Sequence, residues 1–186
     1  MPKLIDADSL FRATLDVFAA NGYLGLTTQE VARRAGINEA TIYRRYGTKA
    51  GLVQAALTQG LSTSPFAHLT ISGDTETDLL AMVEAFRDTT RLYGGAVVTL
   101  LTEASHHPEL RAAMAPLLVN MSRATDVLQT HQQNGELMPG SPWQQLLLLL
   151  SPLLAIGLWA RTGVAPPAEP TSSELVAAFL DGQRTH

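Results

Sequence analysis

The chain of 186 residues contains no cysteine. This absence excludes disulfide bridges and thiolate metal sites, and nothing in the sequence requires an oxidising compartment. The opening residues, MPKLIDADSL, also lack the apolar core and the small-residue cleavage site of a secretory signal peptide. We therefore expect the protein to work in the reducing cytoplasm.

An excess of positive charge is missing as well, because the formal net charge is -4. The charge is unevenly divided: residues 1–50 hold seven Lys and Arg against five Asp and Glu, and the remaining residues hold six against twelve. A strongly basic domain, the usual footprint of a nucleic-acid-binding protein, is therefore absent. Any affinity for nucleic acid should come from a few placed contacts in two copies of the chain.

No apolar run is long enough to be an obvious membrane span. The longest candidate covers residues 146–160 and is interrupted by Ser151, Pro152 and Gly157, whereas a spanning helix needs about 20 apolar residues. We expect a buried helix here and no membrane, with a membrane-associated protein as the alternative.

Two short helices around a tight turn are predicted between residues 27 and 46. Thr27 and Glu30 have the spacing of a reciprocal capping box, and Gly36 suits the left-handed residue that ends a helix. Asn38 is a strong N-cap for a second helix over residues 39–45. Two such helices form a helix-turn-helix motif, whose second helix lies in the major groove of DNA.

The same stretch resembles a known family. The matching positions are Phe18, Gly22, Thr27, Val31, Ala32, Ala35, Gly36, Ile37, Thr41, Ile42, Tyr43, Tyr46, Lys49 and Leu52. In this order and without gaps, they resemble the N-terminal domain of the tetracycline-repressor (TetR) family over roughly residues 8–54. The resemblance implies a homodimeric transcriptional regulator, with a repressor as our leading hypothesis, in which the last two helices form a four-helix interface with a second copy.

The predicted fold is all-α, with about nine helices. Residues 1–50 are expected to form a three-helix DNA-binding domain, and residues 51–186 a helical domain for ligand binding and dimerisation. In this second part we expect one helix from residue 74 to the Gly94-Gly95 pair and another over residues 96–106. Later helices are expected over residues 108–134, 143–162 and 172–183, the last two providing the dimer interface.

The expected partner is a double-stranded, near-palindromic DNA operator. Short polar side chains at the helix starts suit phosphates and base edges, and cations and a tyrosine suit phosphates. The predicted DNA contacts are Thr28, Gln29, Asn38, Glu39, Thr41, Tyr43, Arg44, Arg45 and Lys49. Of these, Glu39 could accept from cytosine N4, or it could be a plain solvated residue.

A small, mostly apolar effector is expected to bind the larger domain and release the DNA. Flexible methionines on inward helical stripes suit an adaptable pocket. The predicted lining consists of Met82, Phe86, Met114, Leu118 and Met121. Such stripes are also typical of an ordinary core, so a helical DNA-binding protein with no effector remains an alternative.

A small metal-binding enzyme is the other alternative, because Glu103 and His107 stand four residues apart and could share one helical face. His106 and His107 are adjacent, and they point about 100° apart on a regular helix, so they do not face a single ion together. The sequence shows no phosphate-binding glycine loop and no nucleophile motif. We therefore expect a protein that is not an enzyme and that needs neither a metal nor a cofactor.

Overall fold

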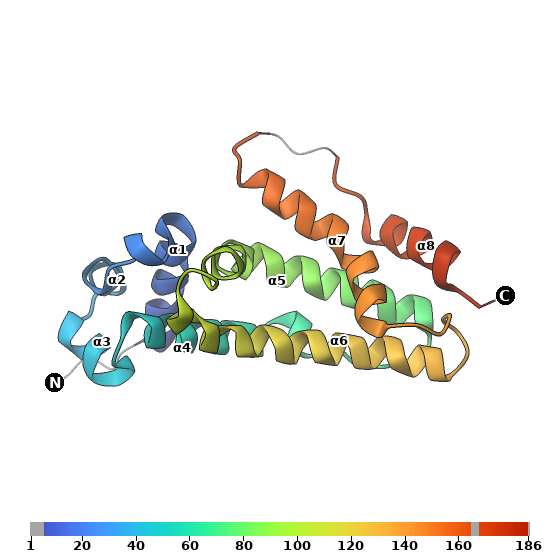
Figure 1. The fold of residues 1–186 in the computed structure, drawn as a ribbon, viewed down its shortest axis with the longest axis horizontal. Helices are drawn as coiled ribbons and strands as arrows, with labels where there is room; N and C mark the ends of the chain where they lie inside the picture. Colours follow the sequence, from blue (N-terminus) through green and yellow to red (C-terminus); the bar gives the residue numbers. More distant parts are fainter. Residues whose placement is uncertain (1–5, 165–167, 186) are drawn as a thin grey trace. The chain divides into compact units, whose positions relative to one another are not determined.

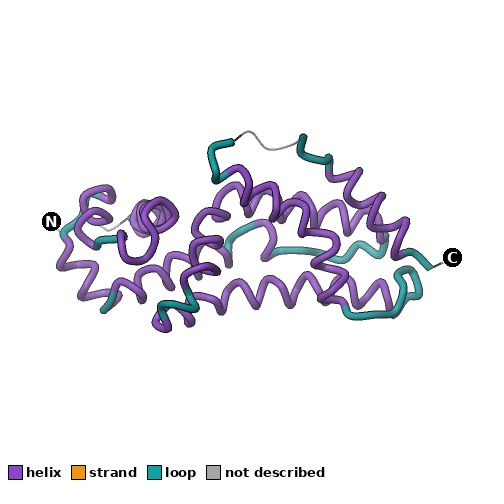
Figure 2. Tube along the Cα trace, turned by 45° about the horizontal axis from the view of Figure 1, so that its top comes forward, coloured by secondary structure: helices purple, strands orange, loops and turns teal. Residues whose placement is uncertain are grey.

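The computed structural model describes residues 6–164 and 168–185, and over these ranges the chain forms helices and no strand (Figures 1 and 2). This confirms the predicted all-α class. The α-helices are α1 (Ala7–Gly25), α2 (Thr28–Ala35), α3 (Glu39–Tyr46), α4 (Lys49–Ser62), α5 (Thr75–Glu103), α6 (Ala115–Gln133), α7 (Pro142–Ala160) and α8 (Ser172–Gln183). Two short 3₁₀ helices, η1 (Pro65–Ala67) and η2 (Pro108–Met114), complete the described elements.

Local capping explains where the first helices begin and end. The Thr27 hydroxyl accepts from the Glu30 amide at 3.2 Å, and the Asn38 side chain accepts from the Ala40 amide at 2.8 Å. Gly36 ends α2 in the left-handed region, at φ 66°. These features confirm the predicted helix ends, and an N-cap of this kind contributes about 1 kcal/mol.

The reciprocal half of the capping box predicted at Thr27 is wrong. The Glu30 carboxylate accepts instead from the guanidinium groups of Arg33 and Arg34, both at 2.7 Å. Both arginines follow Glu30 by three or four residues, which places them beside its carboxylate on the helix surface. The complete capping box occurs at α8, where Thr171 and Glu174 exchange both hydrogen bonds.

The predicted helix break at Gly94-Gly95 is also wrong, because α5 is continuous from Thr75 to Glu103. Two interior glycines cost roughly 1 kcal/mol each relative to alanine. The residues that follow them offset this cost, since Ala96 and Leu100 are fully buried in a hydrophobic core. Two predicted helices are therefore one, which accounts for eight α-helices in the described ranges where about nine were expected.

The segment predicted as one helix over residues 108–134 is divided. Its first turns are the 3₁₀ helix η2, and α6 begins only at Ala115. Its predicted end is confirmed, because Gly135 follows α6 at φ 77°. The helix α7 continues through Pro152 as one element, so the proline does not break it.

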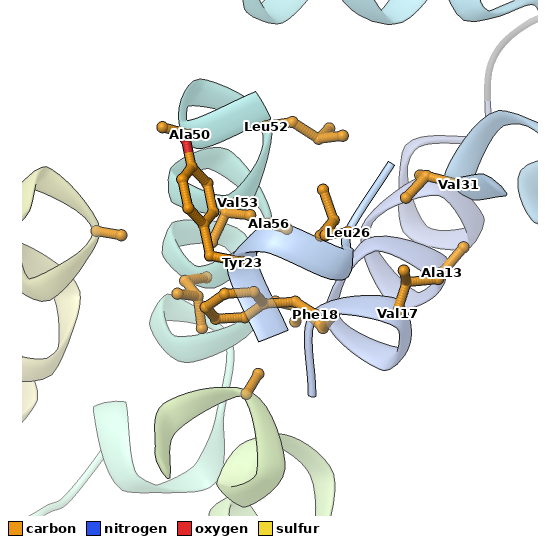
Figure 3. Packing of buried hydrophobic residues seen from close by; sticks show 14 of the residues in the cluster. Ala13, Val17, Phe18, Tyr23, Leu26, Val31, Ala50, Leu52, Val53 and Ala56 are labelled. Carbon is orange, nitrogen blue, oxygen red and sulfur yellow. The ribbon is translucent and has the colours of Figure 1, made fainter. Parts of the chain in front are cut away.

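The chain forms two compact units, each with its own hydrophobic core. The first unit contains residues up to Thr63 together with Tyr93–Leu118, and the second contains Ser64–Leu92 and the residues from Val119 onward. In the first core, α1, α2 and α4 meet around Phe18, Tyr23 and Leu52 (Figure 3). A functional boundary near residue 50, inside the first unit, stays a prediction.

Candidate nucleic-acid interface

The recognition-type helix α3 is held by one buried residue. Ile42 is 1% exposed and packs into the first core, where Val31 of α2 and Leu52 of α4 are also buried. In the chain, α2 directly precedes α3 and α4 directly follows it. The tight turns at Gly36 and Gly47 bring both helices against α3. A short helix fixed on one face in this way presents its other faces outward.

The outward faces carry most of the predicted DNA contacts. Tyr43 is 52% exposed, and Arg44 and Arg45 are exposed beside it. Gln29 and Asn38 are also exposed. Arginine and tyrosine donors on an exposed helix suit phosphate oxygens and the edges of bases. The structure therefore gathers hydrogen-bonding groups and two cations on this helix-turn-helix surface.

Two further predicted contacts, Thr28 and Glu39, bind each other. Thr28 is only 5% exposed, and its hydroxyl donates to the Glu39 carboxylate. The same hydroxyl lies 3.0 Å from the Tyr43 hydroxyl oxygen. The first turn of α2 is thereby tied to α3 at two points, and Thr28 and Glu39 fix the angle between the two helices.

Lys49 also has a partner inside the protein. Its ammonium donates to the Tyr23 carbonyl oxygen at 2.6 Å and lies 4.3 Å from the centre of the Tyr23 ring. A phosphate contact by Lys49 would compete with these interactions. Thr41, the remaining predicted contact, is half-buried on α3.

Two cations at the end of α2 were not among the predicted DNA contacts. Arg33 and Arg34 are exposed, and both pair with Glu30. Their hydrogen bonds, with Arg33 contributing most, lower the pKa of the Glu30 carboxyl to about 2. The i, i+3 and i, i+4 spacing of these charges was the signal that could have identified the cluster. At neutral pH, Glu30 therefore offsets part of the positive charge beside the motif.

The five residues predicted to bind the effector do not all lie in one cluster. Met82 and Phe86 of α5 lie in the second core, and Met121 of α6 packs against it. Met114 packs against the first core instead, and Leu118 is 59% exposed. The structure therefore brings three of the five together.

The residues of the enzyme alternative are engaged in contacts with Tyr23. Glu103 accepts from the Tyr23 amide at 2.6 Å, and the His107 ring lies 4.9 Å from the Tyr23 ring. No group of three or more potential His, Asp or Glu ligands is arranged to hold a metal ion in the described part of the chain.

Comparisons with known proteins agree with this geometry. The family model "Bacterial regulatory proteins, tetR family" matches residues 10–56, and the model "Tetracyclin repressor-like, C-terminal domain" matches residues 71–179. An uncharacterized HTH-type transcriptional regulator of Mycobacterium tuberculosis is 28% identical over 92% of this chain and 82% of its own length. The uncharacterized HTH-type transcriptional regulator YvkB of Bacillus subtilis is 29% identical over 69% of each chain.

Solved structures share the fold. A transcriptional regulator from Rhodococcus sp. superposes with a TM-score of 0.73 at 20% identity, covering 97% of this chain and 99% of the other. The TetR-family regulator PfmR from Thermus thermophilus has a TM-score of 0.63 at 17% identity and covers 92% of this chain and 94% of its own. With both family models matched in order along the sequence, the chain is a DNA-binding, helix-turn-helix transcriptional regulator and belongs to the TetR family.

Proposed function

We propose that the protein is a cytoplasmic repressor that binds a near-palindromic operator as a homodimer and is released by a small, mostly apolar effector. The observation that carries this proposal is the exposed face of α3, where Tyr43, Arg44 and Arg45 project from a helix anchored by Ile42. Helices of this kind in a dimer meet successive major grooves about 34–36 Å apart, so the operator should contain two inverted half-sites.

We assign two kinds of contact to the interface. Gln29, Tyr43, Arg44 and Arg45 bind phosphates and set the register of the protein on the duplex. Asn38, Thr41 and Glu39 lie on or beside the start of α3, where side chains meet base edges, and read the sequence. Thr28 supports Glu39 and Tyr43 from α2 through its hydroxyl.

The homodimer is assigned to α7 and α8. One face of α7 packs into the second core through Leu146, Leu149 and Leu150. The rest of its surface leaves large apolar side chains exposed, and these are Trp143, Leu147, Leu148, Leu154, Leu158 and Trp159. Because water-exposed apolar area of this extent favours a partner surface, a second copy of the chain is the proposed occupant.

A membrane is the competing explanation for this apolar face. By length and composition, α7 is the one described helix that could cross a membrane. The buried leucines of α7 belong to the second core, together with residues of α5, α6 and α8. Membership of a family of DNA-binding regulators favours the dimer.

The effector is assigned to the second unit. Met82 is fully buried and Phe86 is 5% exposed, so an apolar ligand would bind by separating side chains that pack together in the free protein. Such a ligand shifts DNA binding only through its different affinity for the two states, a coupling typically worth about 1–3 kcal/mol. Hydrophobic compounds that raise the melting temperature of the protein would identify it.

Removing a cation from α3 tests the DNA interface. We expect Arg44→Ala and Arg45→Ala each to weaken binding to a duplex selected from random DNA, and to lower the slope of log affinity against log salt by about 1.8, the value for two lost phosphate contacts, one in each subunit of the dimer. The measurement is fluorescence anisotropy at a series of salt concentrations. Arg91→Ala removes another exposed arginine, which pairs with Asp88 on α5, and should leave the affinity and the slope unchanged. Equal behaviour of all three variants would contradict the assigned interface.

A charge on the exposed face of α7 tests the dimer. Leu148 is 60% exposed and lines a shallow groove with Gln144, Leu147 and Ser151. We expect Leu148→Glu to convert the dimer into monomers in sedimentation velocity, because a carboxylate would be buried without a partner at the interface. Leu92→Glu is the control, since Leu92 is 67% exposed on α5. A Leu148→Glu protein that stays dimeric would place the interface elsewhere.

A further inference from the structure

The backbone amide and carbonyl of Tyr23 are each held by a charged side chain. Its amide donates to Glu103 Oε2 at 2.6 Å, and its carbonyl oxygen accepts from Lys49 Nζ at 2.6 Å. The side chain is 7% exposed and points toward Ala50 and Val53 of α4 (Figure 3). The backbone of one buried residue, Tyr23, thus joins two oppositely charged residues that are far from each other in sequence.

Tyr23 and Lys49 lie at the two ends of the helix-turn-helix motif. Tyr23 precedes α2, and Lys49 is the first residue of α4, directly after α3 and its turn. The entrance of the helix-turn-helix motif at Tyr23 and its exit at Lys49 are therefore linked by the hydrogen bond from Lys49 to the Tyr23 carbonyl. Glu103, the last residue of α5, is the third element fixed at this point.

Gly22 leaves the space that the Glu103 carboxylate occupies. A Cβ atom built on Gly22 would lie 2.4 Å from Glu103 Oε1, closer than real Cβ contacts. Gly22 also has φ 70° and ψ -177°, a conformation essentially restricted to glycine. The backbone at the end of α1 is thus shaped so that a carboxylate reaches the Tyr23 amide over a residue without a side chain.

We propose that Glu103 is a positioning residue for DNA binding, which sets the orientation of the helix-turn-helix motif by holding the Tyr23 amide opposite Lys49. This inference rests on the proposed DNA-binding function of α3. Glu103 acts through the backbone at the entrance to the motif and does not itself bind DNA. Lys49 acts at the exit of the motif in the same way, through the Tyr23 carbonyl.

The test compares Glu103→Ala, which removes the acceptor, with Glu103→Gln, which keeps an acceptor oxygen and removes the charge. The probe is the duplex that the wild-type protein selects from random DNA, and affinities are measured on the folded, active fraction over a series of salt concentrations. We expect Glu103→Ala to weaken binding about tenfold or more, as for the loss of a hydrogen bond to a charged group. Glu103→Gln should restore most of the affinity, and the salt slope should be unchanged in both variants.

Several results would overturn the inference. If the folded fraction of Glu103→Ala bound like the wild type, Glu103 would only stabilise the fold. If both variants bound DNA more tightly, Glu103 would act by repelling phosphates. A wild-type protein that selects no duplex would contradict the proposed function and this inference together, whereas an unaffected Glu103→Ala contradicts the inference alone.

Lys49→Met is a second variant that tests the same proposal, and it can be measured even if Glu103→Ala fails to fold. We expect weaker binding with an unchanged salt slope, because the ammonium holds a carbonyl oxygen and no phosphate. A slope that falls by about 1.8, for one phosphate contact in each subunit, would show that Lys49 binds a phosphate, and would overturn the role assigned to it here.

Discussion

His131→Ala is expected to lower the free energy of unfolding by about 3–5 kcal/mol, the cost of leaving a buried charge without its partner. His131 is fully buried in the second unit, and each ring nitrogen faces a carboxylate. Nε2 lies 2.9 Å from Asp78 Oδ2, and Nδ1 lies 2.6 Å from Glu136 Oε2. Without the ring, the carboxylate of Asp78, itself 4% exposed, loses the partner opposite it.

Hydrogen bonds explain why the carboxyl groups of Asp78 and Glu136 are ionised. Burial raises the pKa of Asp78, but hydrogen bonds from Ser72 and His131 outweigh it and hold the pKa below its ordinary value. Hydrogen bonds from His131, and then from Thr75, lower the pKa of Glu136. A lowered carboxyl pKa adds stability above the unfolded-state value and loses it as the pH falls through the folded-state value. The wild type should therefore lose this contribution below the ordinary values of 3.8 and 4.5.

Urea unfolding of the wild type and His131→Ala measures this contribution at neutral and acidic pH. His68→Ala is the matched control, because His68 is an exposed histidine of the same unit. The difference between wild type and His131→Ala should shrink in acid, where the carboxyl groups are protonated. A loss for His131→Ala no larger than that of the exposed control would show that the buried ring does not stabilise the fold, and would contradict the expected loss.

Gly22→Ala is expected to cost about 3 kcal/mol of stability. The backbone conformation of Gly22 is strained by roughly 1–3 kcal/mol for a residue with a side chain. The added methyl group would also displace the Glu103 carboxylate, which lies 2.4 Å from the Cβ position, and overpacking of this kind adds about 1–3 kcal/mol. The change should be visible in thermal unfolding and should also free the Tyr23 amide.

Gly36→Ala is the matched control for Gly22. Gly36 has φ 66° and ψ 33°, and no neighbouring atom lies within 4 Å of its Cβ position. The stability cost of Gly36→Ala then comes only from the left-handed backbone conformation, about 1–2 kcal/mol. A similar loss for the two variants would mean that Glu103 moves aside freely and holds no fixed position at Gly22.

The features predicted correctly from sequence are those determined by nearby residues. Asn38 caps α3 and Gly36 ends α2 because each needs partners only a few residues away. The order of such signals was enough to identify the helix-turn-helix motif.

The features that were wrong or missed depend on partners far away in the chain. The Gly94-Gly95 pair is compatible with a helix because the residues after it are buried in the first core, which periodicity alone does not show. Glu103 accepts from the Tyr23 amide, 80 residues earlier in the chain. The sequence does not show this partner, so Glu103 was interpreted as a possible metal ligand. His131 was not singled out, since Asp78 is 53 residues away in sequence.

The most direct test of the central claim places a DNA-cleaving probe on α3. Because the chain has no cysteine, Ala40→Cys, at an exposed position of α3, provides a single site for an iron chelate, with Ser122→Cys at an exposed position of α6 as the control. On the selected duplex, we expect Ala40→Cys to cleave at two positions about one helical turn, or 34–36 Å, apart, as two copies of α3 in successive major grooves require. Cleavage at a single position, or equal cleavage by the Ser122→Cys control, would contradict the account.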